Sequence, residues 1–233
     1  MFLNPEINQH NLQIIHNNIL KYSPHPEKVC IIAVTKKKPY QAIESAFAHK
    51  INIVGESTIQ ETETKLRERV LPKNKEIHLI GHLQSNKVKK AIKIYNVIHS
   101  VDTIKLINKI NSAAKKQEKK QKIFLQINTN KKHTQKGFLE EEIYKAAEHA
   151  TQKTNLLLLG IMGIGPNTRE TKRTNKAFMN IKKHQKQIEK NINPKAQNLS
   201  IGMSQDYILA LQNGATHIRI GTMLYKQEEK YGK

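Results

Sequence analysis

Short runs of apolar residues alternate along the chain with longer stretches in which apolar residues recur every three or four positions. The short runs are rich in Ile, Val and Leu and are bounded by polar or glycine-containing segments. Such runs are typical of strands that are buried on both faces, and the longer stretches are typical of amphipathic helices. The pattern predicts eight strands, at residues 29–34, 51–54, 77–80, 96–100, 122–128, 156–162, 199–202 and 216–221.

Helical patterns lie between these runs, which predicts a parallel sheet whose outer surface is covered by helices. Eight such units in 233 residues fit a closed (β/α)8 TIM barrel, and an open doubly wound sheet is the alternative α/β fold. One more amphipathic helix is predicted at about residues 6–22, ahead of a barrel at about residues 28–226. Because no segment rich in Gly, Ser or Pro divides the chain, we expect one domain over residues 1–233.

The chain is strongly basic, with 40 Lys and Arg residues against 19 Asp and Glu residues and a net charge of +21. A field of this sign favours binding to nucleic acids or anionic membranes. The lysines are spread over the whole chain, and aromatic side chains that could stack on bases make up 5% of the residues. We prefer the explanation that an AT-rich genome has shaped the composition, so we expect no specific nucleic-acid partner.

The single cysteine, Cys30, excludes an intramolecular disulfide and a thiolate zinc site. No His, Asp and Glu cluster has the spacing of metal ligands, which disfavours a metal hydrolase. The N-terminal segment lacks the charged region and apolar core of a signal peptide, and no apolar stretch approaches the ~20 residues that span a bilayer. We therefore expect a cytoplasmic protein without a membrane partner.

The segments that follow the predicted strands are rich in Gly, Ser, Thr, Lys and Asn, and a TIM barrel carries its chemistry at these strand ends. Gly202 and Ser204 come just before a predicted helix, where Ser204 suits the N-cap. Gly221 and Thr222 stand at the end of the eighth predicted strand. Because the loops after strands 7 and 8 of TIM barrels often bind phosphate, these residues predict an anion site.

A lysine follows the first predicted strand in a position to face the same site. Side chains alternate along a strand, so Ile32, Val34 and Lys36 share one face, and Lys37 points to the other. If Ile32 and Val34 fill the barrel interior, Lys36 reaches the barrel mouth. An amine opposite an anion site is what pyridoxal 5′-phosphate (PLP) requires, because its aldehyde needs an amine. The alternative is that Lys36 is one more solvated lysine.

Several segments resemble, in order, motifs of the pyridoxal phosphate homeostasis protein family, whose members are barrels similar to the N-terminal domain of alanine racemase. The resemblance extends from about residue 28 to residue 226. The segments are "AVTKKKP", "VGESTIQE", "IHLIGHLQSNK", "FLQINTNKKHTQKGF", "LLGIMGIGP" and "LSIGMSQDYILALQNGATHIRIGTMLY".

This resemblance implies that Lys36 holds PLP as a lysine aldimine and that Arg219 approaches the pyridine nitrogen. It also implies a phosphate site formed by Gly202, Met203, Ser204, Gly221 and Thr222. Ser57 stands where the family has asparagine, so we expect it at the cofactor with a contact that is shortened or lost. The family is regarded as a carrier and regulator of PLP that buffers it and supplies apo-enzymes, without established turnover.

A racemase of the same barrel type is the alternative, although the second domain that supplies the racemase tyrosine has no counterpart in the sequence. The loss of that domain's dimer contacts also favours a monomer. A basic nucleic-acid-binding protein is a third hypothesis. Lys136 is a candidate second amine for handing off the cofactor, and His82 is a candidate to flank its ring. The alternative for each of these two residues is a solvated loop side chain, which we prefer for Lys136.

Overall fold

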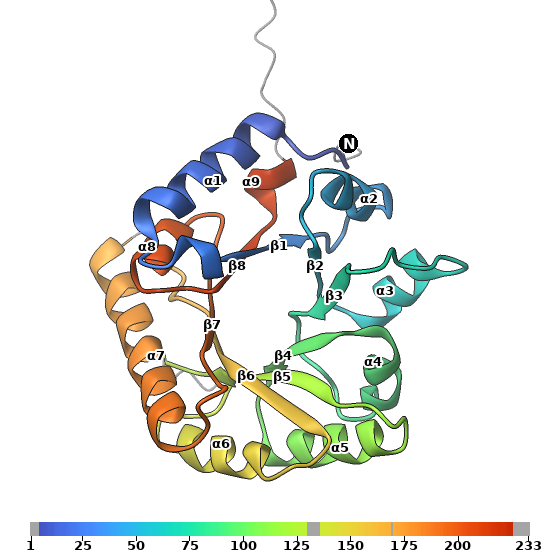
Figure 1. The fold of residues 1–233 in the computed structure, drawn as a ribbon, viewed down its shortest axis with the longest axis vertical. Coiled ribbons are helices and arrows are strands. Elements are labelled where there is room, and N and C mark those ends of the chain that lie inside the picture. The colour runs from blue at the N-terminus through green and yellow to red at the C-terminus, as the bar shows by residue number, and fades with distance from the viewer. Residues whose placement is uncertain (1–4, 130–135, 169, 226–233) are drawn as a thin grey trace, which may run out of the picture.

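Eight parallel strands pair in chain order and close into a barrel, which is seen end-on in Figure 1. The computed structural model describes residues 5–129, 136–168 and 170–225. Strand β1 pairs with β2 on one side and with β8 on the other, where Ala33 lies opposite Ile220. The strands are β1 (Cys30–Val34), β2 (Ile53–Glu56), β3 (Glu76–Leu79), β4 (Val97–Val101), β5 (Gln121–Ile127), β6 (Leu156–Gly163), β7 (Asn198–Met203) and β8 (His217–Ile220).

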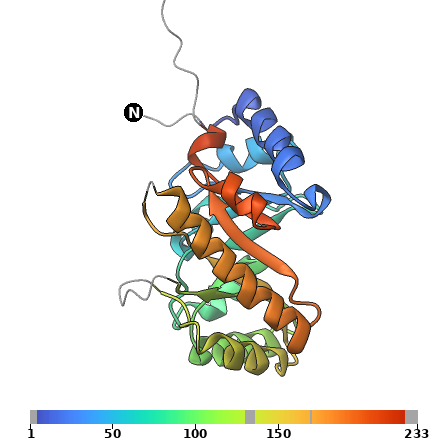
Figure 2. The same cartoon turned by 90° about the vertical axis from the view of Figure 1, so that its left-hand side faces the viewer.

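Helices follow the strands and form the outer layer, with the long α7 running along one side of the barrel (Figure 2). Most of them bury one apolar face against the strands, which is the amphipathic arrangement that their sequence pattern predicts. The helices are α1 (Gln9–Tyr22), the 3₁₀ turn η1 (Pro26–Lys28), α2 (Gln41–Ala48), α3 (Ile59–Leu66), α4 (Val88–Ile94), α5 (Ile104–Lys115), α6 (Ile143–Thr151), α7 (Thr171–Asn191), α8 (Tyr207–Gln212) and α9 (Thr222–Tyr225).

The predicted closed barrel is confirmed, and the open doubly wound sheet is excluded because β1 and β8 pair. Each of the eight predicted strands overlaps an observed strand, with ends that differ by at most two residues. The predicted N-terminal helix begins at Gln9, where the Asn8 side chain caps it by accepting the backbone N–H of Asn11.

Helix α1 is hydrogen-bonded to α8 and α9, the last two helices of the barrel. The backbone N–H of Asn8 donates to the carbonyl of Leu224 at 2.8 Å, and the Asn11 amide donates to the carbonyl of Met223 at 2.9 Å. The Asn18 amide donates to the Tyr207 hydroxyl at 2.6 Å. These bonds fix α8 and α9, which follow the two strands where the sequence predicts an anion site; Figure 1 shows α1 beside α9.

The core has two layers of different chemistry. Apolar side chains fill the space between the strands and the helices. The barrel interior holds the small apolar group of Val97, Phe124 and Met162 together with the buried rings of His78, His99 and His217. Near-continuous apolar strands predict an apolar interior, so these histidines are among the buried polar groups that the hydrophobic pattern does not predict.

Candidate functional site

A cavity of about 650 Å³ lies at the carboxyl ends of the strands. Side chains that follow β1, β2, β6 and β7 line it together with Arg219 of β8 and the start of α9. Seven of the eight predicted site residues lie on its wall: Lys36, Ser57, Met203, Ser204, Arg219, Gly221 and Thr222. The eighth, Gly202, is buried behind the wall. The structure thus brings together residues that are almost 190 positions apart in the chain.

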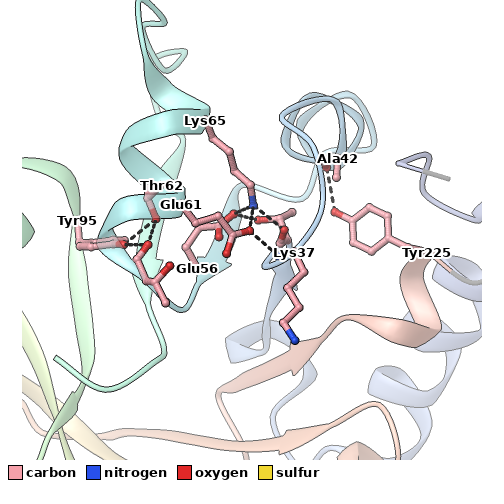
Figure 3. A network of polar contacts seen from close by, with 10 residues as sticks. Lys37, Ala42, Glu56, Glu61, Thr62, Lys65, Tyr95 and Tyr225 are labelled. Carbon is pink, nitrogen blue, oxygen red and sulfur yellow. Dashed lines mark hydrogen bonds and ion pairs between the residues drawn. The ribbon is translucent and has the colours of Figure 1, made fainter. Parts of the chain in front are cut away.

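Lys36 stands in the turn directly after β1 and lines the cavity beside Val34. The preceding residue of the same face, Ile32, is fully buried, so the alternation inferred from the sequence continues through the strand end. Lys37 adopts a left-handed φ of 60°, and its backbone N–H donates to the Glu61 carboxylate. Its ammonium points away from that carboxylate (Figure 3). The turn therefore presents Lys36, and not its neighbour, to the cavity.

A buried cluster of charged side chains is hydrogen-bonded to the backbone of this turn. The Lys65 ammonium donates to the carbonyl of Thr35 at 2.7 Å and pairs with the carboxylates of Glu56 and Glu61, each at 2.7 Å (Figure 3). The Thr35 hydroxyl donates to Glu56 at 2.6 Å. Three acceptors thus satisfy the three ammonium hydrogens, and one of them is the backbone carbonyl next to Lys36.

Sequence reasoning missed this cluster. Glu56 and Glu61 both fall inside the segment "VGESTIQE", but only Ser57 of that segment was interpreted as a site residue. A carboxylate at the end of a buried strand is a signal that could have indicated Glu56, because a charge in that position needs a partner. Burial raises the pKa of Glu56, while its hydrogen bond from Lys65 opposes the rise.

The anion site predicted after β7 and β8 is built from a hydroxyl and backbone amides. The Ser204 hydroxyl oxygen accepts the backbone N–H of Gly221 at 3.3 Å and that of Met223 at 3.4 Å. Both bonds are long, so a phosphate oxygen at this point would receive the two N–H groups together with the hydroxyl. At Gly221 a Cβ would lie 3.2 Å from the Cβ of Val34, so glycine lets the end of β8 pack closely against β1.

The prediction that Ser204 caps the following helix is wrong. Helix α8 begins at Tyr207 with Asp206 before it, and the Asp206 carboxylate accepts the backbone N–H of Met203 at 2.6 Å. This bond closes a turn over residues 203–206 and frees the Ser204 hydroxyl for the amides at the end of β8. Gly202 permits the turn, since its φ is +90° and a Cβ there would lie 2.5 Å from the Cβ of Ala210.

Arg219 brings a buried cation to the floor of the cavity. Its guanidinium donates to the carbonyl and hydroxyl of Ser200, at 2.7 and 2.9 Å, and to the carbonyl of Gly163 at 2.9 Å. Burial lowers the pKa of Arg219 to about 10, and the charge of Asp206 opposes the fall. The group stays protonated at neutral pH, so it donates hydrogen bonds and accepts no proton.

The structure separates His82 and Lys136 from this cavity. Both line a second, smaller cavity of about 320 Å³ together with Asp102, whose carboxylate lies 3.2 Å from Nδ1 of His82. Among the described residues, neither side chain contributes to the wall that holds Lys36. The hypothesis that His82 flanks the cofactor ring thus lacks support from its position, and Lys136 stays a separate candidate amine.

No group of three His, Cys, Asp or Glu residues in the described part of the chain could hold a metal ion. None of the helices in the described ranges is long and apolar enough to cross a membrane. The large cavity offers an amine, a guanidinium and an amide-lined cradle.

These groups, at the carboxyl ends of a closed parallel barrel, define a protein of the alanine racemase N-terminal domain class, and the family model with the description "Alanine racemase, N-terminal domain" matches residues 9–229. A relative from Vibrio alginolyticus named "Pyridoxal phosphate homeostasis protein" is 30% identical over 203 residues, which cover 86% of this chain and 87% of the relative. The chain belongs to the pyridoxal phosphate homeostasis protein family.

Solved structures agree with this assignment. The structure of PipY from Synechococcus elongatus with PLP bound is 30% identical, has a TM-score of 0.77, and is matched over 91% of this chain and 99% of its own. An alanine racemase from Clostridium difficile has a TM-score of 0.74 at 18% identity, over 97% of this chain and 59% of the racemase. The second similarity supports the barrel fold alone.

Proposed function

We propose that this chain binds pyridoxal 5′-phosphate in the 650 Å³ cavity, holds it covalently through Lys36, and stores and supplies it without turnover of its own. The observation that carries the proposal is that a lysine amine, a buried guanidinium and an open amide cradle line one cavity. Membership of a family whose relatives are named for PLP homeostasis supports it, as does the PLP bound to PipY.

The residues of the cavity fit this cofactor. The Lys36 amine would hold the aldehyde carbon, and the hydroxyls of Ser204 and Thr222 would hold the phosphate together with the backbone of Gly202, Met203 and Gly221. Ser57 would add a short polar contact. Arg219 would face the ring nitrogen and, as a permanent donor, would keep that nitrogen unprotonated. When bound, the cofactor supplies an aldehyde that condenses with amines and a ring that can withdraw electrons.

A carrier is favoured over a racemase because the described residues of the cavity wall supply the Lys36 amine without a tyrosine to act as the second acid. Among the described residues no tyrosine or histidine lines it, and the nearby Asp206 carboxylate is bonded to the backbone N–H of Met203. Reprotonation of a substrate carbon from the second face needs a second acid, as the racemase tyrosine provides. Incubation with L- and D-alanine tests this alternative, since sustained α-proton exchange at about 1 s⁻¹ or faster would establish a racemase.

Covalent mapping tests the proposed role of Lys36. The purified protein is mixed with PLP, reduced with borohydride and digested, and the modified peptide is identified by mass spectrometry. We expect the label on Lys36 and a visible absorbance band that the Lys36→Ala variant lacks. Lys37→Ala is the matched control and should keep both, because Lys36 lines the cavity and Lys37 is not among its lining residues. A label on Lys136, with Lys36 unmodified, would overturn the assignment.

We further propose that the chain works as one domain over residues 1–233, as a monomer in the cytoplasm, and that apo-enzymes that use PLP are its recipients. Size-exclusion chromatography with light scattering tests the monomer. Recovery of activity by an apo-enzyme mixed with the PLP-loaded protein tests the supply. A dialysis membrane between the two proteins decides whether the transfer needs direct contact.

A further inference from the structure

A column of polar side chains passes through the barrel interior below Arg219. The rings of His78 and His99 are fully buried, with centroids 5.0 Å apart, and Phe124 stacks on His99 at 4.3 Å. His217 packs beside both histidines at 6.4 and 6.0 Å. Polar groups in this setting need partners, because an unsatisfied buried donor or acceptor costs stability.

The partners form one continuous chain of hydrogen bonds. The Arg219 guanidinium donates to the Ser200 hydroxyl at 2.9 Å, which lies 3.0 Å from Nδ1 of His99. Nε2 of His99 lies 2.9 Å from Nδ1 of His78. Nε2 of His78 lies 2.7 Å from the Glu76 carboxylate, at the opposite end of the barrel from the cavity. Lys122 pairs with the other oxygen of Glu76 at 3.0 Å.

The chemistry of the two ends fixes the direction of every bond between them. Arginine only donates, and an ionised carboxylate only accepts. A neutral histidine and a serine can each donate one bond and accept one along such a chain. All four bonds are therefore satisfied when every proton points from Arg219 toward Glu76. His78 and His99 then both carry their proton on Nε2, and the Ser200 hydroxyl offers Arg219 a lone pair.

The charges around the column agree with neutral imidazoles. Burial lowers the pKa of His78 and lowers that of His99 still further. The hydrogen bond from His78 is the largest cause that lowers the pKa of Glu76, to about 2, and Lys122 adds to it. The carboxylate is thus ionised at neutral pH. If the protons pointed the other way, the unprotonated Nε2 of His78 would face this carboxylate, and two lone pairs would repel each other.

We propose that Glu76 is a positioning residue for the cavity at the far end of the barrel. By accepting from His78 it fixes the tautomers of both histidines and the rotation of the Ser200 hydroxyl. The hydroxyl lone pair then holds the guanidinium of Arg219 at the floor of the cavity. The link from Arg219 to cofactor affinity rests on the proposed function, whereas the order of protons in the column does not.

Nitrogen-15 NMR of the cofactor-free protein at neutral pH tests the proton order, because long-range spectra distinguish a protonated ring nitrogen from a bare one. We expect both His78 and His99 to carry the proton on Nε2. In Glu76→Ala we expect a mixture of tautomers at both rings, since the acceptor that excludes the reverse order is gone. A proton on Nδ1 of either ring in the wild type, or unchanged tautomers in Glu76→Ala, would overturn the proposal.

Two further variants test separately the group that faces His78 and the positive charge of Lys122. Glu76→Gln places one oxygen and one NH2 group where the carboxylate has two oxygens. Because Lys122 only donates, it holds the amide oxygen, and the NH2 group then donates to Nε2 of His78, so this variant should move the proton of both rings to Nδ1. Lys122→Met removes the neighbouring cation but leaves the carboxylate, so it should keep the wild-type tautomers. Glu76 is half-buried at the edge of the barrel, and circular dichroism checks that each variant is folded.

Affinity for PLP, measured by fluorescence titration, tests the positioning role. We expect about a ten-fold loss in Glu76→Ala, the size of one hydrogen bond to a charged group, and little change in Lys122→Met. Altered tautomers with unchanged affinity would overturn the positioning role. If the wild type itself bound no PLP, the proposed function would fail, while the NMR result on the cofactor-free protein would still decide the proton order.

Discussion

Replacing Lys65 by methionine should destabilise the protein severely, because it leaves Glu56 without its cation. Glu56 is fully buried, and its carboxylate pairs with the Lys65 ammonium at 2.7 Å. Breaking a buried pair in this way typically costs about 3–5 kcal/mol of unfolding free energy. The orphaned carboxyl can escape by taking up a proton, which at pH 7 costs ~3.7 kcal/mol for an ordinary pKa of ~4.3. The two energies agree, so we expect the free energy of unfolding to fall by about 4 kcal/mol.

Urea denaturation followed by circular dichroism measures this loss. Because the variant binds a proton that the wild type lacks, the loss should shrink by about 1.4 kcal/mol between pH 7.5 and pH 6.5. The double variant Glu56→Gln with Lys65→Met should recover most of the stability. Lys90→Met, which breaks an exposed pair with Glu63, should cost at most about 1 kcal/mol. A Lys65→Met loss below that of Lys90→Met, or one that is independent of pH, would refute the reasoning.

Three more predictions follow from single positions. Gly202→Ala should lower the free energy of unfolding by at least about 2 kcal/mol, and Gly214→Ala should lower it by about 1 kcal/mol. Both glycines have a positive φ, but only at Gly202 would the added Cβ clash with a neighbouring atom. Urea denaturation of the two variants measures the difference. Ser204→Ala should weaken PLP binding about ten-fold in a fluorescence titration, and binding of pyridoxal without its phosphate should change little. Burial lowers the pKa of His217 to about 3, so the folded ring stays neutral at pH 5 while the unfolded chain binds a proton. The free energy of unfolding therefore falls as the pH drops below about 6.5, and His217 accounts for about 2 kcal/mol of this fall at pH 5. In a His217→Leu variant, denaturation at neutral pH and at pH 5 should show a fall that is smaller than in the wild type by about 2 kcal/mol.

The barrel and the position of Lys36 could be predicted because both depend on local patterns. Apolar runs mark strands that are buried on both faces, and alternation from Ile32 through Val34 sets the direction of Lys36. Ser204 and Gly221 could be paired in advance because the ends of neighbouring parallel strands always lie at one edge.

Features that depend on contacts between distant residues escaped prediction. Lys65 is one of 40 cations in the chain, and nothing in its neighbourhood marks it as buried. The helix after Ser204 begins later than its pattern indicates, because Asp206 bonds to Met203. His82 and Lys136 follow strands β3 and β5, and only the closed barrel shows that these ends open into a different cavity.

The order in which the cavity wall is encoded has a consequence for synthesis on the ribosome. Lys36 emerges early, whereas Ser204, Arg219 and Gly221 emerge 168 to 185 residues later. Strand β1 cannot gain its second neighbour until β8 has been translated. A nascent chain therefore carries the amine long before it has the cradle, and under the proposed function PLP can meet its full set of contacts only after translation has passed residue 222.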